Sequence, residues 1–271
     1  MVKRKEPARA GFSRRDALAL IGGFVLVIGL LAVAVMAVQK PSDQNWSSTA
    51  NKNNLRQLAN AVIYSHDQNK TISPYFGMYG GKLTGTFHYH LLPFIENTPV
   101  WNAPDPNAVI TPFLASNDPT LRNPPAGATN YVVNMRLFYS EGGLGELQEG
   151  PKLIKLKWGQ VIDGTSQTLL FATKYHTCGN GGSLWYDPAH NSPNSPTAAT
   201  FGVSMNLWQR APTQAACDPL AGTAVSFNPD YMLVVFCDAS VHTVSTSISP
   251  ATWQALHTYA GKDVVGETGI D

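Results

Sequence analysis

The longest apolar stretch of the chain runs without interruption from Ala17 to Val38. As an α-helix it would extend about 33 Å, which is enough to cross a hydrocarbon layer of about 30 Å. The pattern therefore predicts a transmembrane helix over residues 12–40. Since no second apolar run of this length occurs in the sequence, we expect the chain to span the membrane once.

Basic residues crowd the stretch before this run and define a basic leader over residues 1–11. They are Lys3, Arg4, Lys5 and Arg9, and Arg14 and Arg15 follow them at the edge of the apolar run. Positive charge on one flank predicts that this flank stays in the cytoplasm. We therefore expect a single-pass protein of the cytoplasmic membrane. Its C-terminal part would lie in the periplasm or at the cell surface.

A second helical pattern follows Pro41, whose ring interrupts the first helix. Apolar side chains recur with the spacing of one helix face at Leu55, Leu58, Ala59, Val62 and Ile63. The opposite face is assigned to Asn51, Lys52, Asn54, Arg56 and Gln57. This periodicity predicts an amphipathic stem helix over residues 41–69, with a capping residue among Ser47, Ser48 and Thr49 and an end near Asp67–Asn69.

Residues 70–271 change to short apolar segments separated by Gly, Pro and Asn. The predicted strands are Asn130–Asn134, Leu153–Leu156, Thr168–Thr173, Met232–Phe236 and the alternating segment Val241–Ser245. A last short helix is expected over Pro250–Tyr259, with Ser249 as its cap and proline in the first turn. The fold class is therefore α+β, with a long N-terminal helix (transmembrane plus amphipathic) packed on a mostly antiparallel β-sheet domain with long loops.

Composition limits the classes of partner and site that we expect for this chain. The formal net charge is only +1 and 14% of the residues are charged, so nothing in the charge balance favours nucleic acid as a partner. Three cysteines occur, none in a Cys-x-x-Cys pair, so a zinc site is not indicated. In an oxidising compartment we favour a disulfide between the two loop cysteines, Cys178 and Cys217, with Cys237 buried in a strand. Three free thiols are the alternative.

Catalytic and metal-binding patterns are weak. His88 and His90 would share one side of a strand, but no acidic third ligand accompanies them, so packing roles are favoured. Asp238, Ser240 and His242 invite a comparison with a hydrolase triad, but no Gly-x-Ser-x-Gly turn occurs. We therefore expect no enzyme, no bound metal and no cofactor.

The junction Gly11-Phe12-Ser13-Arg14-Arg15-Asp16, followed by an apolar helix, resembles the prepilin processing site of type IV pilins and type II secretion pseudopilins. In that class a peptidase cleaves after the glycine, and the new N-terminal residue, often Phe, is methylated. The fifth residue of the mature chain is usually Glu, and Asp16 occupies that place here. Arg14 and Arg15 stand where the class has apolar residues.

Downstream segments resemble, in the same order, a planctomycete-type bacterial family of prepilin-like proteins that carry domain of unknown function 1559. They are Asn53–Leu58 with Tyr64–Asp67, Leu91–Glu96, Asp163–Tyr175, and Phe236–His242 with Ser247–Ser249. Ala239 replaces the glycine that is usual in the last of these. The resemblance implies a pseudopilin-like structural subunit of a type II secretion-like or type IV pilus-like assembly.

The resemblance also implies partners and residue roles. Gly11 and Phe12 would flank the bond cut by a prepilin peptidase. Asp16 would pair with the terminal amine of a neighbouring pilin-like subunit, because an isolated carboxylate in a membrane helix is costly. Local pairing of Asp16 with Arg14 or Arg15 at the membrane surface is the alternative.

Two other readings of the N-terminal region stay open. Ser13–Leu18 also resembles a twin-arginine export signal, with Val35-Met36-Ala37 as a cleavage site, which would release an exported domain. Alternatively, an intact anchor would hold an extracytoplasmic domain that binds ligands such as glycans and does not assemble. A mature N-terminus at Phe12, Val38 or Met1 distinguishes prepilin processing, signal-peptide removal and an uncleaved anchor.

Overall fold

The computed structural model describes residues 42–81, 84–121, 125–139, 154–186, 195–219, 223–262 and 269–271, with side chains from Ser48 onward. The chain divides into two compact units, Met1–Trp46 and Ser47–Asp271, and the second unit is described here. Within the described residues, no helix is both long and apolar enough to cross a membrane. The predicted membrane segment, residues 12–40, lies outside them.

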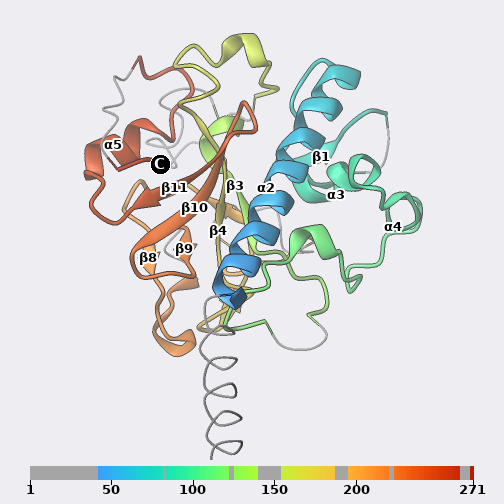
Figure 1. The fold of residues 1–271 in the computed structure, drawn as a ribbon. Coiled ribbons are helices and arrows are strands. Elements are labelled where there is room, and N and C mark those ends of the chain that lie inside the picture. Colours follow the sequence, from blue (N-terminus) through green and yellow to red (C-terminus); the bar gives the residue numbers. More distant parts are fainter. Residues whose placement is uncertain are drawn as a thin grey trace, which may run out of the picture. The chain divides into compact units, whose positions relative to one another are not determined.

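Helix α2, Ser42–Asn69, is the longest element in the described part of the chain (Figure 1). Leu55, Leu58, Ala59 and Val62 on its inner face are fully buried, as the apolar periodicity predicts. The predicted end near Asp67–Asn69 is also confirmed. From Ser47 onward the helix belongs to the same compact unit as the sheet, so it is an integral part of the globular fold.

Two details of the stem-helix prediction are wrong. The helix already begins at Ser42, so Ser47–Thr49 lie inside it and do not cap it. Asn51, assigned to the polar face, is 2% exposed. Its Oδ1 accepts hydrogen bonds from the Ser116 amide (3.2 Å) and the Tyr131 hydroxyl (3.3 Å), which satisfy the buried amide.

A five-stranded mixed sheet has the strand order β11-β10-β4-β3-β7 (Figure 1). Its strands are β3 (Tyr131–Asn134), β4 (Leu169–Thr173), β7 (Thr200–Phe201), β10 (Tyr231–Phe236) and β11 (Val241–Ser245). All neighbours are antiparallel except β3 and β7, which are parallel. The α+β class is confirmed, and the sheet is mixed at its β7 edge.

Shorter elements occupy much of the rest of the described residues. The remaining strands are β1 (Phe76–Met78), β2 (Thr84–Thr86), β5 (Thr177–Cys178), β6 (Gly181–Gly182), β8 (Gln209–Arg210) and β9 (Val225–Ser226). The remaining α-helices are α3 (Phe87–Leu91), α4 (Thr98–Asn102) and α5 (Pro250–Ala255). The 3-10 helices are η1 (Leu92–Ile95), η2 (Thr111–Phe113), η3 (Met135–Phe138), η4 (Trp158–Gln160) and η5 (Gln214–Ala216).

The central sheet separates two apolar cores. Val133 and Val235 face the core that contains the α2 side chains Leu55 and Leu58. Their strand neighbours Val132 and Val234 face the opposite core, which contains Trp253 of α5. This alternation is what a strand period of two requires when both faces of a sheet are covered. It explains why these strands read as continuous apolar runs in the sequence.

Four of the five strand predictions are confirmed, by β3, β4, β10 and β11. The prediction for Leu153–Leu156 is wrong over its described residues, 154–156, where no strand forms. The Ile154 amide donates to the Phe138 carbonyl (2.9 Å), and the Leu156 carbonyl accepts from the Ile72 amide (2.8 Å). The backbone groups of the β-prone residues Ile154 and Leu156 are thus hydrogen-bonded within a connecting segment, where no neighbouring strand is available.

The C-terminal elements follow their local sequence signals. Ser249 accepts a hydrogen bond from the Thr252 amide and caps α5, as predicted, but the helix ends at Ala255, before Tyr259. Ala239 lies in the turn between β10 and β11 with φ 67°, a left-handed conformation that favours glycine. Glycine would adopt this conformation without the steric cost that a Cβ adds.

Candidate functional site

The residues predicted to guide processing and assembly lie outside the described residues. They are Gly11, Phe12, Arg14, Arg15 and Asp16. The described part of the chain offers three further features with functional potential. These are a disulfide between β5 and the residue after η5, several buried titratable side chains, and a surface along the outer face of α2.

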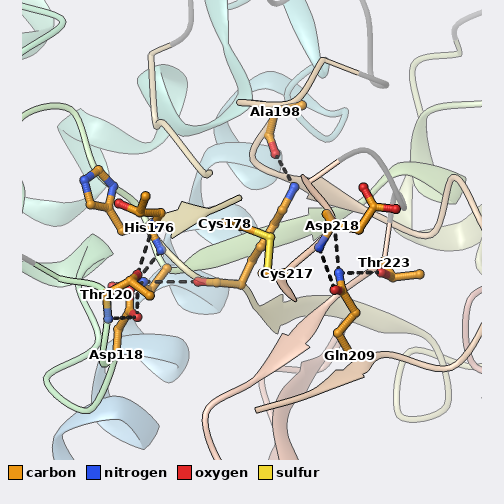
Figure 2. Close-up of a disulfide and its surroundings, with 12 residues drawn as sticks. Asp118, Thr120, His176, Cys178, Ala198, Gln209, Cys217, Asp218 and Thr223 are labelled. Carbon is orange, nitrogen blue, oxygen red and sulfur yellow. Dashed lines mark hydrogen bonds between the residues drawn. A yellow bond between two sulfur atoms is a disulfide. The ribbon is translucent and has the colours of Figure 1, made fainter. Parts of the chain in front are cut away.

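Cys178 and Cys217 form a disulfide with a Cα–Cα distance of 4.9 Å, the pairing favoured from the sequence (Figure 2). Cys178 ends β5, and Cys217 follows η5. Gly179 follows Cys178 and has a φ of +56°. A Cβ at this position would lie 2.6 Å from the Cys217 carbonyl oxygen, so the close approach of the two segments requires glycine. Cys237 is a free, buried thiol whose pKa is raised by burial.

Polar networks hold the chain on both sides of the bridge (Figure 2). The carboxylate of Asp118, only 6% exposed, accepts from the amide and hydroxyl of Thr120, from the Asn130 side chain and from the His176 amide. On the other side, the Gln209 amide group bonds the Asp218 backbone in both directions, at 2.8 and 2.9 Å. Because four donors satisfy Asp118, we assign it a structural role.

Lys174 is a fully buried cation beside this network. Its Nζ donates to the Ala198 carbonyl at 3.3 Å. Burial lowers its pKa from 10.5 to about 8, and the charge of Asp218 opposes this shift only partly. The ammonium group is therefore retained at pH 7 at a cost in stability, because water solvates it better than the protein does.

Replacement of Lys174 by methionine is expected to stabilise the fold at pH 7. The lowered pKa implies that the buried charge costs up to about 3 kcal/mol, and an apolar side chain of similar length removes that cost. Urea unfolding of Lys174→Met at pH 7 should give a free energy of unfolding about 1–3 kcal/mol higher than the parent. The exposed Lys155→Met is the matched control and should change little. A clear loss of stability in Lys174→Met would contradict the assignment.

The two histidines considered as metal ligands are separated by the fold. They lie on helix α3 instead of a strand, where residues two apart point in different directions. His88 bonds the Tyr131 carbonyl (2.7 Å), and His90 bonds the Gly77 carbonyl (2.8 Å). Among the described residues, no group of three or more His, Cys, Asp or Glu side chains could hold a metal ion.

The triad comparison also finds no support in the geometry. The Ser240 hydroxyl donates to Asp238 within their own turn. The ring of His242 instead packs edge-on against Phe236, with centroids 5.2 Å apart. His242 thus contacts Phe236, and the Ser240 hydroxyl is bonded to Asp238.

The outer face of α2 carries a continuous row of amide and aromatic side chains, here called the amide stripe. Its members are Asn53, Gln57, Asn60, Tyr64 and Gln68. The spacing of three or four residues places them on one helix face, over a length of about 22 Å. Tyr64 is 60% exposed, an unusual position for a large aromatic ring.

Two hollows border the amide stripe. The first, of about 340 Å³, lies along Asn53, Gln57, Asn60 and Tyr64. The second, of about 350 Å³, lies beyond Gln68, with walls from Tyr79, His90 and Trp101. Phe94 lines both hollows, so they adjoin. This surface was not predicted from the sequence, although the helical spacing of its amides is visible there.

Comparisons with protein-family models, with curated proteins and with solved structures find no match to this chain.

Proposed function

We propose that this protein is an envelope-exposed, pseudopilin-like structural subunit of a type II secretion-like or type IV pilus-like assembly. Residues 12–40 would anchor it in the cytoplasmic membrane, with its N-terminus in the cytoplasm. The globular unit would face the periplasm or the cell surface and offer a surface to partners.

One observation carries the proposal: the prepilin-like junction and apolar segment lead in sequence into a helix that is built into a sheet domain. Helix α2 begins at Ser42, four residues after Val38, and its inner face lies in the core through Leu55 and Val62. Such a helix suits a subunit whose globular domain follows directly on its membrane segment in the sequence. The disulfide supports an oxidising, extracytoplasmic location.

The mature N-terminus tests the processing step. We expect mass spectrometry of the protein from its native envelope to find a chain beginning at Phe12, with a methyl group on its amine. A chain beginning at Val38 would instead support signal-peptide removal. An unprocessed Met1 would support the alternative, an anchored ligand-binding domain that does not assemble.

Substitution of Asp16 tests the assembly step. A carboxylate in the membrane helix stabilises stacking only if it pairs with a neighbouring subunit. Asp16→Ala should therefore abolish incorporation into sheared surface filaments or a pelletable pseudopilus fraction, while the protein level stays normal. Asp67→Ala, which removes an exposed carboxylate of α2, is the control and should assemble as the parent does. Unchanged incorporation of Asp16→Ala would refute the assembly function.

A further inference from the structure

The amide stripe and the two hollows beside it form one extended surface. Phe94 joins the hollows, Tyr64 borders the first, and Trp101 borders the second. Each hollow falls within the range of about 300–1,000 Å³ that is common for small-molecule sites. Because the surface follows the helix for about 22 Å, its shape suits an extended ligand better than a compact one.

Charge is nearly absent from this surface. Burial lowers the pKa of His90 and raises the pKa of Tyr79, so both rings are neutral at pH 7. Arg56, in the first hollow, is the one charged side chain that lines either hollow among the described residues. A phosphate, carboxylate or metal ion would find little compensation here, and an uncharged ligand is favoured.

The polar groups are amides, which both donate and accept hydrogen bonds. Hydroxyl groups do the same, so a ligand rich in hydroxyls matches Asn53, Gln57, Asn60 and Gln68. Aromatic rings present an apolar face, on which the C–H faces of sugar rings can pack. The combination of amide side chains with the rings of Tyr64, Phe94 and Trp101 therefore fits a saccharide chain.

The second hollow is held rigid by its own hydrogen bonds. The Tyr79 hydroxyl donates to the Thr71 carbonyl at 2.7 Å, and Asn69 Nδ2 donates to the Ser65 carbonyl at 2.9 Å. The Tyr89 hydroxyl donates to the Trp101 carbonyl at 2.8 Å and fixes the end of α4. A preformed wall loses less freedom on binding, which favours affinity for a weakly held ligand.

We propose that the outer face of α2, from Asn53 to Gln68, forms a binding site for a neutral oligosaccharide chain together with the adjoining hollow beside Trp101. The ligand would lie along the amide stripe, with one sugar ring in the hollow beside Trp101. This inference goes beyond the proposed structural function, and it does not depend on cleavage after Gly11 or on the pairing of Asp16.

The test is calorimetric titration of the detergent-solubilised full chain with defined hexasaccharides. The neutral probes are β-1,4-linked glucose, α-1,4-linked glucose, β-1,4-linked mannose and β-1,4-linked N-acetylglucosamine, and hexagalacturonic acid is the acidic comparison. We expect at least one neutral probe to bind with a dissociation constant below about 1 mM. Trp101→Ala should weaken that binding about tenfold, as expected for a central aromatic contact.

Variants separate binding from folding. Trp158→Ala removes another half-buried tryptophan that packs on the same core but lines neither hollow, and it should bind as the parent does. The double variant Asn60→Ala/Gln68→Ala changes side chains on the helix surface, so it should keep the parent's melting temperature and bind more weakly.

Three outcomes would overturn the proposal. The first is that no neutral probe binds. The second is that Trp101→Ala and the double amide variant both bind the probe as tightly as the parent does. The third is that only hexagalacturonic acid binds and Arg56→Gln abolishes its binding, which would make the surface an anion site. None of these outcomes bears on filament incorporation, so they leave the structural function to its own test.

Discussion

Acidification from pH 7 to pH 4 is expected to lower the free energy of unfolding by about 6 kcal/mol through two buried histidines alone. They are His88 in α3 and His257, which follows α5. In each, burial lowers the pKa from 6.5 to about 4. A loss of this size is comparable to the whole stability of many domains, so the protein should unfold in mild acid.

His88 is held neutral by an apolar surround. Its Nε2 lies 2.7 Å from the Tyr131 carbonyl oxygen, so this nitrogen carries the proton of the neutral ring. Phe87 and Phe113 contact the ring edge-on, with centroids 5.8 and 5.2 Å away. A second proton would place a positive charge among these rings, and burial away from water therefore lowers the pKa of His88.

His257 occupies a similar environment on the other side of the sheet. Its Nδ1 bonds the Trp253 carbonyl at 2.7 Å, and the rings of Phe201 and Trp253 contact it. The positive charge of Arg136 opposes protonation further. In both cases the unfolded chain binds more protons between pH 6.5 and pH 4, so stability is fully present above pH 6.5 and is lost as pH falls toward 4.

Glutamine variants isolate this effect from the acid titration of carboxylates. His88→Gln and His257→Gln keep a hydrogen-bond donor but cannot be protonated. In urea unfolding at pH 7 and pH 4, each should reduce the parent's pH-dependent loss by about 3 kcal/mol, and the double variant by about 6 kcal/mol. Val133→Ala, a buried strand substitution, should lower stability at both pH values and keep the full loss. Equal losses in the parent and the double variant would contradict the prediction.

Local signals in the sequence predicted most of the scaffold. Apolar periodicity placed the buried face of α2 at Leu55, Leu58 and Val62, and β-prone runs located the strands β4 and β10. These signals succeed because each element covers a core with its own side chains. They failed at Asn51, whose partner Ser116 is 65 residues away, and at Ile154–Leu156, whose backbone partners are Phe138 and the distant Ile72.

The surface along α2 could be predicted only in part. The spacing of Asn53, Gln57, Asn60 and Gln68 is visible in the sequence, but exposed amides on a helix usually indicate only a solvated face. Phe94 and Trp101 come from η1 and α4, and nothing local to them indicates that they border the same helix. Tertiary packing brings the two sets together.

Removal of the disulfide is expected to cost about 4 kcal/mol of stability. Cys178 and Cys217 are 39 residues apart, and the loss of loop-closure entropy in the unfolded chain gives a value of this size for such a loop. The loop carries β7, which forms the edge of the central sheet beside β3. Without the bridge, unfolding would release this edge together with the segment that holds Lys174 Nζ through Ala198.

Cys178→Ala/Cys217→Ala should therefore show a urea midpoint well below that of the oxidised parent. Dithiothreitol should lower the urea midpoint of the parent to that of the double variant, and it should leave the midpoint of the double variant unchanged. Cys237→Ala is the matched control, because it removes a buried sulfur without opening a crosslink. Its smaller loss of stability, about 1–2 kcal/mol, should persist under both redox conditions. If reduction left the parent's stability unchanged, the bridge would contribute nothing to stability. The support that the disulfide lends to an oxidising, extracytoplasmic location would then also be lost.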